Sequence, residues 1–486
     1  QTCALPISVI STEVMPGHKS LSSEAKGQPV ERFDTRAELK SVLSLGWPIV
    51  LTQLFIMLTG TIDAALAGHY SSTDLAGVSL GGMVMWPVFM LLTGLTMAMT
   101  PIIAQLRGAG EDHKIAHQVR QGMWVCVVTA FLLVLALMNV ATVFEWAEVD
   151  AEATRIAREY LAAAAWGAPA VVFYVTLRYV FEGLGRTRPP MWIAGAMIPI
   201  NGLLNYVFVY GKFGFPELGG VGCGYATAII FWIELIVMLL VCRMPVFADL
   251  GAFSRFEWPN LESISSIMVI GLPIGLTIFF EMAVFSVVGM LIARIGVTEV
   301  AANSIAGNLN WATYVIPAAL GNAASIRVGY HVGARDFAAA RATSAAVYKF
   351  SLLYAVFVSI LLVLARYQLV LIFTTDTVVV ELAATLVLFI AVYQLVDDSN
   401  AVAVGALRGY KDTRVPLYVG LVGFWGIAVP LGYLLAEGIL LPGLAPGIYG
   451  YWAALTLGLT IVAIIMALRL RHISGNERKI LEFAAT

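Results

Sequence analysis

The chain has 486 residues, of which 59% are hydrophobic and 12% are charged. Soluble domains carry about 25% charged residues, so this composition excludes an ordinary soluble protein. Lys and Arg number 29 against 31 Asp and Glu, which leaves no net positive charge to attract nucleic acid. The four cysteines are Cys3, Cys126, Cys223 and Cys242. Their positions lack the paired spacing that a zinc site or a disulfide framework requires.

Twelve runs of the chain are long and apolar enough to cross a bilayer as helices. A spanning helix needs about 20 mostly apolar residues, because lipid offers no hydrogen-bond partner for the backbone. Residues 1–40 are polar and are expected to be neither a signal peptide nor a span. The expected spans are 46–67, 79–103, 122–144, 160–183, 190–211, 222–242, 266–293, 303–326, 343–365, 381–405, 415–436 and 447–468.

The basic residues predict how these spans are oriented. Both tails and the loops after even-numbered spans hold 22 of the 29 Lys and Arg residues, whereas the loops after odd-numbered spans hold five. Lys and Arg in short loops stay on the cytoplasmic side. We therefore expect both termini to be cytoplasmic.

An internal repeat divides the spans into two sets of six. Short motifs recur at an offset of 225 or 226 residues, and self-similarity at a fixed offset reports architecture directly. The matched segments are 46–49 with 271–274, 73–76 with 298–301, 108–109 with 333–334, 187–190 with 413–416, and 224–225 with 450–451.

The repeat predicts an all-α membrane protein built from two related six-helix bundles. Because six is even, both bundles enter the membrane from the same side, so their pseudo-twofold axis runs along the membrane normal. Transporters place substrate and ion sites between such halves. The expected domains are a partly disordered cytoplasmic tail (1–40), an N-terminal bundle (41–245), a cytoplasmic linker (246–264), a C-terminal bundle (265–472) and a cytoplasmic tail (473–486).

Four polar side chains are expected at similar depth in the N-terminal bundle. Asp63 lies about 25 Å along its span at 1.5 Å per residue, and Asn201 and Asn205 share one helix face because they are four residues apart. Thr227 follows one to two turns into the sixth span. Their oxygen atoms suit a small hard cation such as Na⁺, or a proton on the carboxylate. The alternative is that these side chains only join helices through hydrogen bonds.

The C-terminal bundle carries its own acidic residues near the expected midplane, Glu281 and Asp397. Tyr393 precedes Asp397 by one helical turn and offers a ring face to a cation. The two acids are suited to Na⁺, a proton or a cationic substrate, and competition among these guests would couple their movements. A purely structural role is the alternative.

Other charged residues also lie within the expected spans. Arg178 is interpreted as the partner of Glu182, one turn later, and is expected to be the one buried basic residue. Asp398 points about 100° away from Asp397, and Glu234 has no assigned role. The chain contains no P-loop, and its histidines lie outside the centres of the spans. We therefore expect neither an enzyme nor a bound cofactor.

Several motifs resemble the multidrug and toxic compound extrusion (MATE) transporters, in particular their bacterial NorM-type branch. They include Thr61-Ile62-Asp63 and the segments at 101–110, 209–224, 325–329 and 407–412. The resemblance covers about residues 38–472 and implies two six-helix bundles in a V around a central cavity. It also implies export of lipophilic organic cations in exchange for Na⁺ or H⁺.

The resemblance extends to individual positions. Those matching the family's cation-binding positions are Asp63, Asn201, Asn205 and Thr227 in the N-terminal bundle and Glu281, Tyr393 and Asp397 in the C-terminal bundle. Asp398 and Glu234 depart from the family pattern by adding negative charge.

The expected protein is a bacterial inner-membrane antiporter that works as a monomer and binds organic cations, Na⁺ or H⁺. One alternative is a flippase of related fold for a lipid-linked precursor, which would need several cationic residues in its cleft. A membrane-embedded transferase and a channel are less favoured, because neither a donor-site motif nor a filter-like loop is found.

Overall fold

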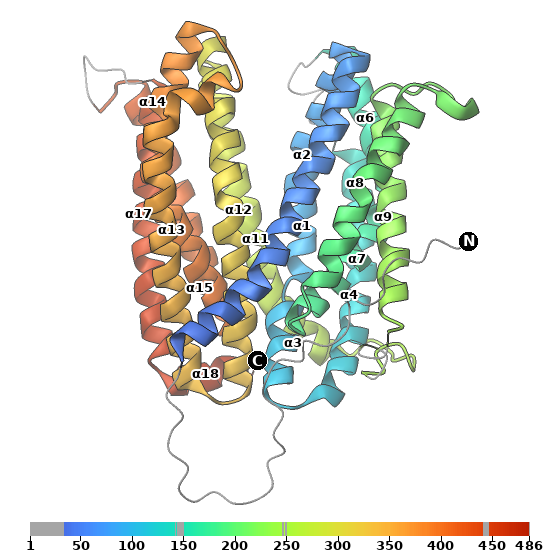
Figure 1. Cartoon of the computed structure of the whole chain (residues 1–486), viewed down its shortest axis with the longest axis vertical. Helices are drawn as coiled ribbons and strands as arrows, with labels where there is room; N and C mark the ends of the chain where they lie inside the picture. Colours follow the sequence, from blue (N-terminus) through green and yellow to red (C-terminus); the bar gives the residue numbers. More distant parts are fainter. Residues whose placement is uncertain are drawn as a thin grey trace, which may run out of the picture. The chain divides into compact units, whose positions relative to one another are not determined.

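The computed structural model describes residues 34–140, 142, 150–244, 247, 250–440 and 447–485, and all regular structure within these ranges is helical (Figure 1). Most of the expected tail 1–40 lies outside them. The helices of the first half are α1 (Thr35–Tyr70), α2 (Ser72–Thr96), α3 (Met99–Gly108), α4 (Asp112–Asn139), α6 (Ala151–Ala165), α7 (Ala168–Gly183), α8 (Arg188–Val209), the short η2 (Lys212–Gly214) and α9 (Val221–Val241). Those of the second half are α11 (Leu261–Ala293), α12 (Val297–Gly333), α13 (Phe337–Leu371), α14 (Thr377–Gly409), α15 (Arg414–Gly420), the π-helix η3 (Leu421–Ala428), α16 (Val429–Ala436), α17 (Ile448–Ser474) and α18 (Glu477–Ala484).

Each of the twelve expected spans corresponds to a helix or to consecutive helices. Within the described residues, ten helical segments are long and apolar enough to cross a membrane, and α6 with α7, bent by 57°, forms an eleventh. The remaining expected span, 303–326, lies inside the 37-residue helix α12. This helix contains four Asn residues, which make it more polar than its neighbours.

The repeat extends to individual hydrogen bonds. Pro48 in α1 and Pro273 in α11 lie inside their helices at equivalent positions, 225 residues apart. One turn later, Thr52 Oγ1 donates to the carbonyl oxygen of Pro48 at 2.8 Å, and Thr277 Oγ1 donates to that of Pro273 at 2.7 Å. A proline removes a backbone hydrogen bond and loosens the helix, so the first helix of each half lacks a backbone hydrogen bond at the equivalent position.

Helices α1 and α11 each pass from one bundle to the other. The start of α1 packs through Val42, Leu45 and Ile49 into a core formed by α12, α14 and α17, whereas its later part contacts α8. Figure 1 shows α1 in blue crossing between the two groups of helices. The start of α11 packs into the core of α2, α4 and α7, and its later part joins the core of α14 and α17.

Ion pairs stabilise the places where α1 and α11 pack against the opposite bundle. Arg327 of α12 donates through Nε and Nη2 to the Glu38 carboxylate of α1 at 2.8 and 2.7 Å. Before α11, Glu257 accepts from Arg120 Nη2 at 2.8 Å and lies 2.7 Å from His117 Nδ1. The sequence-based expectation that Arg178 is the one buried basic residue is therefore wrong, because Arg327 and Arg120 are also buried.

The two bundles meet closely between α3 and α12. Gly108 of α3 lies against the carbonyl oxygen of Tyr330, and Gly333 of α12 lies against that of Gln105. An added Cβ at either glycine would collide with these oxygens. Gln105 Nε2 also donates to the carbonyl oxygen of Gly409 at 2.9 Å. Glycine therefore permits a backbone approach that no larger residue allows here.

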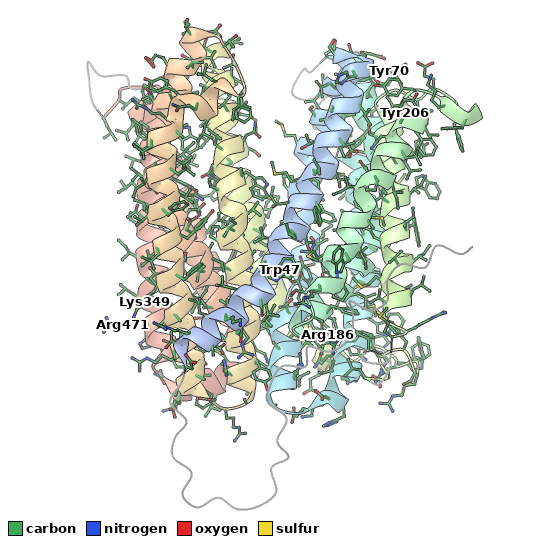
Figure 2. The ribbon with its side chains drawn as sticks, in the orientation of Figure 1. Trp47, Tyr70, Arg186, Tyr206, Lys349 and Arg471 are labelled. Carbon is green, nitrogen blue, oxygen red and sulfur yellow. The ribbon has the colours of Figure 1, made fainter. Side chains whose placement is uncertain are left out.

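Basic side chains mark one end of the helices. Figure 2 shows Arg186 and Arg471 toward one end, here called the basic end, and Tyr70 and Tyr206 toward the other. Arg186 and Arg471 belong to the loop and tail that the charge pattern assigns to the cytoplasm. The close contacts between the bundles involve the ends of α3, α12 and α14, which lie toward the basic end (Figure 1).

Candidate cation sites in the two bundles

The first site surrounds Asp63, which lies on α1 and is buried. Asn201 Nδ2 and Asn205 Nδ2 of α8 donate to Asp63 Oδ1 at 3.0 and 2.6 Å. Thr227 Oγ1 of α9 lies 3.5 Å from Asp63 Oδ2, and Cys223 Sγ lies 3.7 Å from its backbone oxygen. The structure thus brings together all four polar residues predicted for this bundle, from three helices.

The side-chain amide oxygens of this site can still accept hydrogen bonds or bind a cation. Asn201 and Asn205 are both fully buried, and their Oδ1 atoms have no hydrogen-bond partner. A buried polar atom without a partner is costly, and carboxylate, amide and hydroxyl oxygens are the ligands that hard cations prefer. The donor set therefore fits either a small cation or a proton on Asp63.

The second site lies in the C-terminal bundle and combines acids with aromatic rings. Asp397 of α14 and Glu281 of α11 are half-buried, and they act on each other electrostatically and on Tyr393. Tyr393 is buried and packs edge-on against Phe285 and Trp452, with ring centroids 6.2 and 6.1 Å apart. Glu281, Tyr393 and Asp397 therefore lie within electrostatic range of one another.

Two further residues belong to this environment and were not predicted as site residues. Tyr314 of α12 interacts electrostatically with both acids, and Arg408, at the end of α14, acts electrostatically on Glu281. Arg408 Nη1 also lies 3.7 Å from Met97 Sδ. Arg408 could have been predicted from its spacing. It follows Asp397 by 11 residues, and residues 11 apart lie on the same helix face, about three turns from each other.

The two sites are not repeats of each other. At the offset of 225 residues, the position equivalent to Asp63 is Val288, and the position equivalent to Glu281 is Ile56. The duplicated scaffold therefore places its buried acids at different positions in the two bundles. Because the two sites differ chemically, they are suited to bind different ligands.

The interpretation of Arg178 and Glu182 as an intrahelical pair is confirmed. Arg178 Nε donates to Glu182 Oε1 at 3.0 Å, and both side chains are buried. Glu234 of α9 is also buried and acts electrostatically on Arg178 and on Tyr174. This group lies inside the N-terminal bundle and includes none of the residues that surround Asp63.

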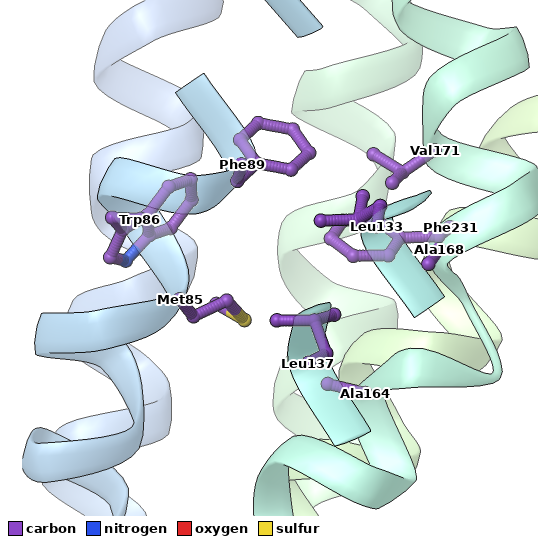
Figure 3. Close-up of a pocket in the computed structure, with 9 residues that line it drawn as sticks. All are labelled: Met85, Trp86, Phe89, Leu133, Leu137, Ala164, Ala168, Val171 and Phe231. Carbon is purple, nitrogen blue, oxygen red and sulfur yellow. The ribbon is translucent and has the colours of Figure 1, made fainter. Parts of the chain in front are cut away.

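An apolar cavity in the N-terminal bundle has no such chemistry. Figure 3 shows side chains from α2, α4, α6, α7 and α9 around it. No carboxylate or amide lines it, so it offers a cation no oxygen ligand. Its lining residues are Met85, Trp86, Phe89, Leu133, Leu137, Ala164, Ala168, Val171 and Phe231.

A duplicated membrane protein that encloses separate polar sites in its two bundles belongs to the class of membrane transporters. The chain matches the MatE family model over residues 48–207 and 273–434. It belongs to the MatE family, so the resemblance to MATE transporters is confirmed.

Curated relatives cover nearly the whole chain. The Multidrug resistance protein MdtK of Proteus mirabilis (strain HI4320) is 37% identical over 446 residues, which cover 91% of this chain and 97% of that protein. MdtK of Edwardsiella ictaluri (strain 93-146) is 36% identical over 452 residues, covering 92% and 98%.

Solved structures share the fold at lower sequence identity. The eukaryotic MATE transporter AtDTX14 superposes with a TM-score of 0.83 at 19% identity, covering 93% of this chain and 99% of that chain. A mutant of the Vibrio cholerae MATE transporter VcmN gives a TM-score of 0.80 at 17% identity, covering 91% and 98%. The expected two-bundle fold is therefore confirmed.

Proposed function

We propose that this protein exports lipophilic organic cations from bacteria in exchange for Na⁺ or H⁺. The observation that carries this proposal is the buried oxygen cage of Asp63, Asn201 and Asn205, with two amide oxygens that lack partners. The names of the curated relatives, which describe multidrug resistance, support the substrate class.

The two sites divide the task. The coupling ion binds the Asp63 site, and the organic cation binds Glu281, Asp397 and Tyr393, where carboxylates supply the countercharge and a ring adds cation–π attraction. The main parts of the N-terminal bundle (41–245) and the C-terminal bundle (265–472), joined by the linker 246–264, then move against each other. The start of α1 moves with the second bundle and the start of α11 with the first, because each packs there. An inside-negative membrane potential contributes about 2.3 kcal/mol for each charge and each 100 mV.

The same proposal places the protein in the inner membrane. Both termini, including the tails 1–40 and 473–486, face the cytoplasm, and the working unit is a monomer. The proposal for the termini rests on the concentration of Lys and Arg at the basic end.

A lipid-linked precursor flippase is less well supported. Phosphate recognition requires free cationic groups, whereas the buried Arg178, Arg120 and Arg327 each form an ion pair with a glutamate. The charges of these three arginines are therefore already paired, and Arg408 has Glu281 as an electrostatic partner.

The test is transport into proteoliposomes. Purified protein is reconstituted, and Na⁺ and pH gradients are imposed separately at fixed membrane potential while ethidium movement is recorded. We expect one gradient to drive ethidium and Asp63→Asn to abolish this coupling. Asp112→Asn, at an exposed site, is the matched control and keeps activity. Absence of ethidium movement under both gradients, or full activity of Asp63→Asn, contradicts the proposal.

A further inference from the structure

Asp398 lies directly after Asp397 but faces a different environment. It is fully buried, with 0% of its surface exposed, and it points about 100° away from Asp397 around α14. Ser351 Oγ of α13 donates to its backbone oxygen at 2.7 Å. Asp398 therefore packs inside the C-terminal bundle, against α13.

The hydrogen bonds around Asp398 are incomplete in a specific way. Gln394 Nε2, one turn earlier on α14, donates to Asp398 Oδ1 at 2.9 Å. Asp398 Oδ2 and Gln394 Oε1 are both buried and without a partner. Both atoms are acceptors when the acid is ionised, so neither can satisfy the other.

One proton added to Asp398 would give both of these oxygens a hydrogen-bond partner. A carboxylic acid carries one donor and one acceptor, as does the matching edge of an amide. A proton on Asp398 Oδ2 can be donated to Gln394 Oε1 while Gln394 Nε2 continues to donate to Oδ1. The result is a closed pair of hydrogen bonds in which both orphaned oxygens gain a partner.

The surrounding charges also favour the neutral acid. The charged group that acts on Asp398 is Asp397 of the same helix, which is negative. Tyr354 of α13 and Tyr314 of α12 interact electrostatically with Asp398 and carry no positive charge. In the part of the chain that the structure describes, no Lys or Arg forms an ion pair with Asp398. A buried and unpaired carboxylate is strongly disfavoured.

We propose that Asp398 is a proton-binding site in the C-terminal bundle, separate from Asp63, and that binding of an organic cation at Glu281 and Asp397 releases its proton. This inference rests on the proposed function. The positive guest neutralises Asp397, whose negative charge favours retention of the neighbouring proton. The proton leaves Asp398 Oδ2 for water, and the resulting carboxylate is stabilised by the new positive charge.

The first experiment counts protons. Ethidium is added to purified, detergent-solubilised protein in weak buffer with a pH indicator, and binding is measured in parallel by fluorescence. We expect the wild type to release about one proton more per bound ethidium than Asp398→Asn, as linkage between the two equilibria requires. The Asn side chain keeps an amide that can pair with Gln394. Glu437→Gln, at an exposed site, serves as a control and releases as many protons as the wild type.

The second experiment needs no variant at position 398. Infrared difference spectra of wild-type protein labelled with ¹³C at aspartate carboxyls should show loss of a protonated-acid C=O band when ethidium binds. Equal proton release by the wild type and Asp398→Asn, or an unchanged acid band, overturns the inference. If the wild type does not bind ethidium, the proposed function fails instead.

Discussion

Asn205 donates from Nδ2 to Asp63 Oδ1 at 2.6 Å across 142 residues of sequence. This bond fixes the carboxylate between α1 and α8, and it leaves Asn205 Oδ1 free to face a guest. The same amide therefore positions the acid and contributes an oxygen to the proposed ion site.

Asn205→Ala should distinguish the two candidate coupling ions. Hydrogen bonds to charged groups contribute about 1.5–3 kcal/mol, or about tenfold or more in affinity. If Na⁺ couples transport, the half-maximal Na⁺ concentration for ethidium movement rises by that factor, because an oxygen ligand is lost. If H⁺ couples transport, the half-maximal point moves to higher pH, because the lost donor no longer stabilises the carboxylate. Asn139→Ala, at an exposed Asn, is the control. An unchanged dependence on both ions contradicts the role of Asn205.

Glu281→Gln and Asp397→Asn should each weaken transport of a singly charged dye by about tenfold or more, which corresponds to about 1.4 kcal/mol. Each substitution removes one of the two carboxylates that share this environment, while the amide keeps a similar shape. The measurement is ethidium transport at several dye concentrations. Glu437→Gln should retain wild-type transport. Full activity of both site variants would contradict the assignment of the organic cation to this bundle.

Gly108→Ala should slow transport, because its methyl group collides with the Tyr330 carbonyl oxygen where α3 meets α12. Overpacking of this kind costs about 1–3 kcal/mol and disfavours the state in which the bundles touch. The expected result is several-fold slower ethidium movement and increased labelling of a single cysteine introduced at Ala334. Gly289→Ala is a matched control, since no atom lies within 4 Å of its added Cβ. Equal rates for the two variants would exclude close packing as the reason for glycine.

The ion pairs of Glu257, which precedes α11, should stabilise the protein less at acidic pH. Hydrogen bonds from Arg120 and His117 lower the pKa of Glu257 to about 2, from the ordinary value of 4.5. A lowered pKa stabilises the folded state above about pH 4.5, and this contribution is lost as the pH falls toward 2. The unfolding temperature of Glu257→Gln should therefore lie below that of the wild type at pH 7, with the gap narrowing as the pH falls from about 4.5 toward 2. Glu262→Gln, at an exposed position, should show no gap. A gap that stays constant with pH would contradict the ion-pair explanation.

Much of the Asp63 site could be predicted from local rules. Asn201 and Asn205 had to share a face, since four residues make about one helical turn. Depth along each span then placed Asp63 and Thr227 at a similar level. The hydrogen bonds to Asp63 agree with both inferences.

The pairing of Gln394 with Asp398 shows where local rules stop. Their spacing of four residues was visible in the sequence, but which side of α14 faces α13 depends on how distant helices pack. The crossing of α1 into the second core has the same origin, because Val42 and Leu45 are apolar enough to pack in either bundle.

The sequence by itself determined the spans, the repeat and the uneven distribution of basic residues, because lipid acts on each segment separately through its length and polarity. Only the tertiary structure decided which bundle receives the start of α1, that Arg408 lies within electrostatic range of Glu281, and that the Asp398 backbone accepts a hydrogen bond from α13. These relationships depend on the rotation and crossing of whole helices, which are fixed by complementary packing between side chains far apart in the chain.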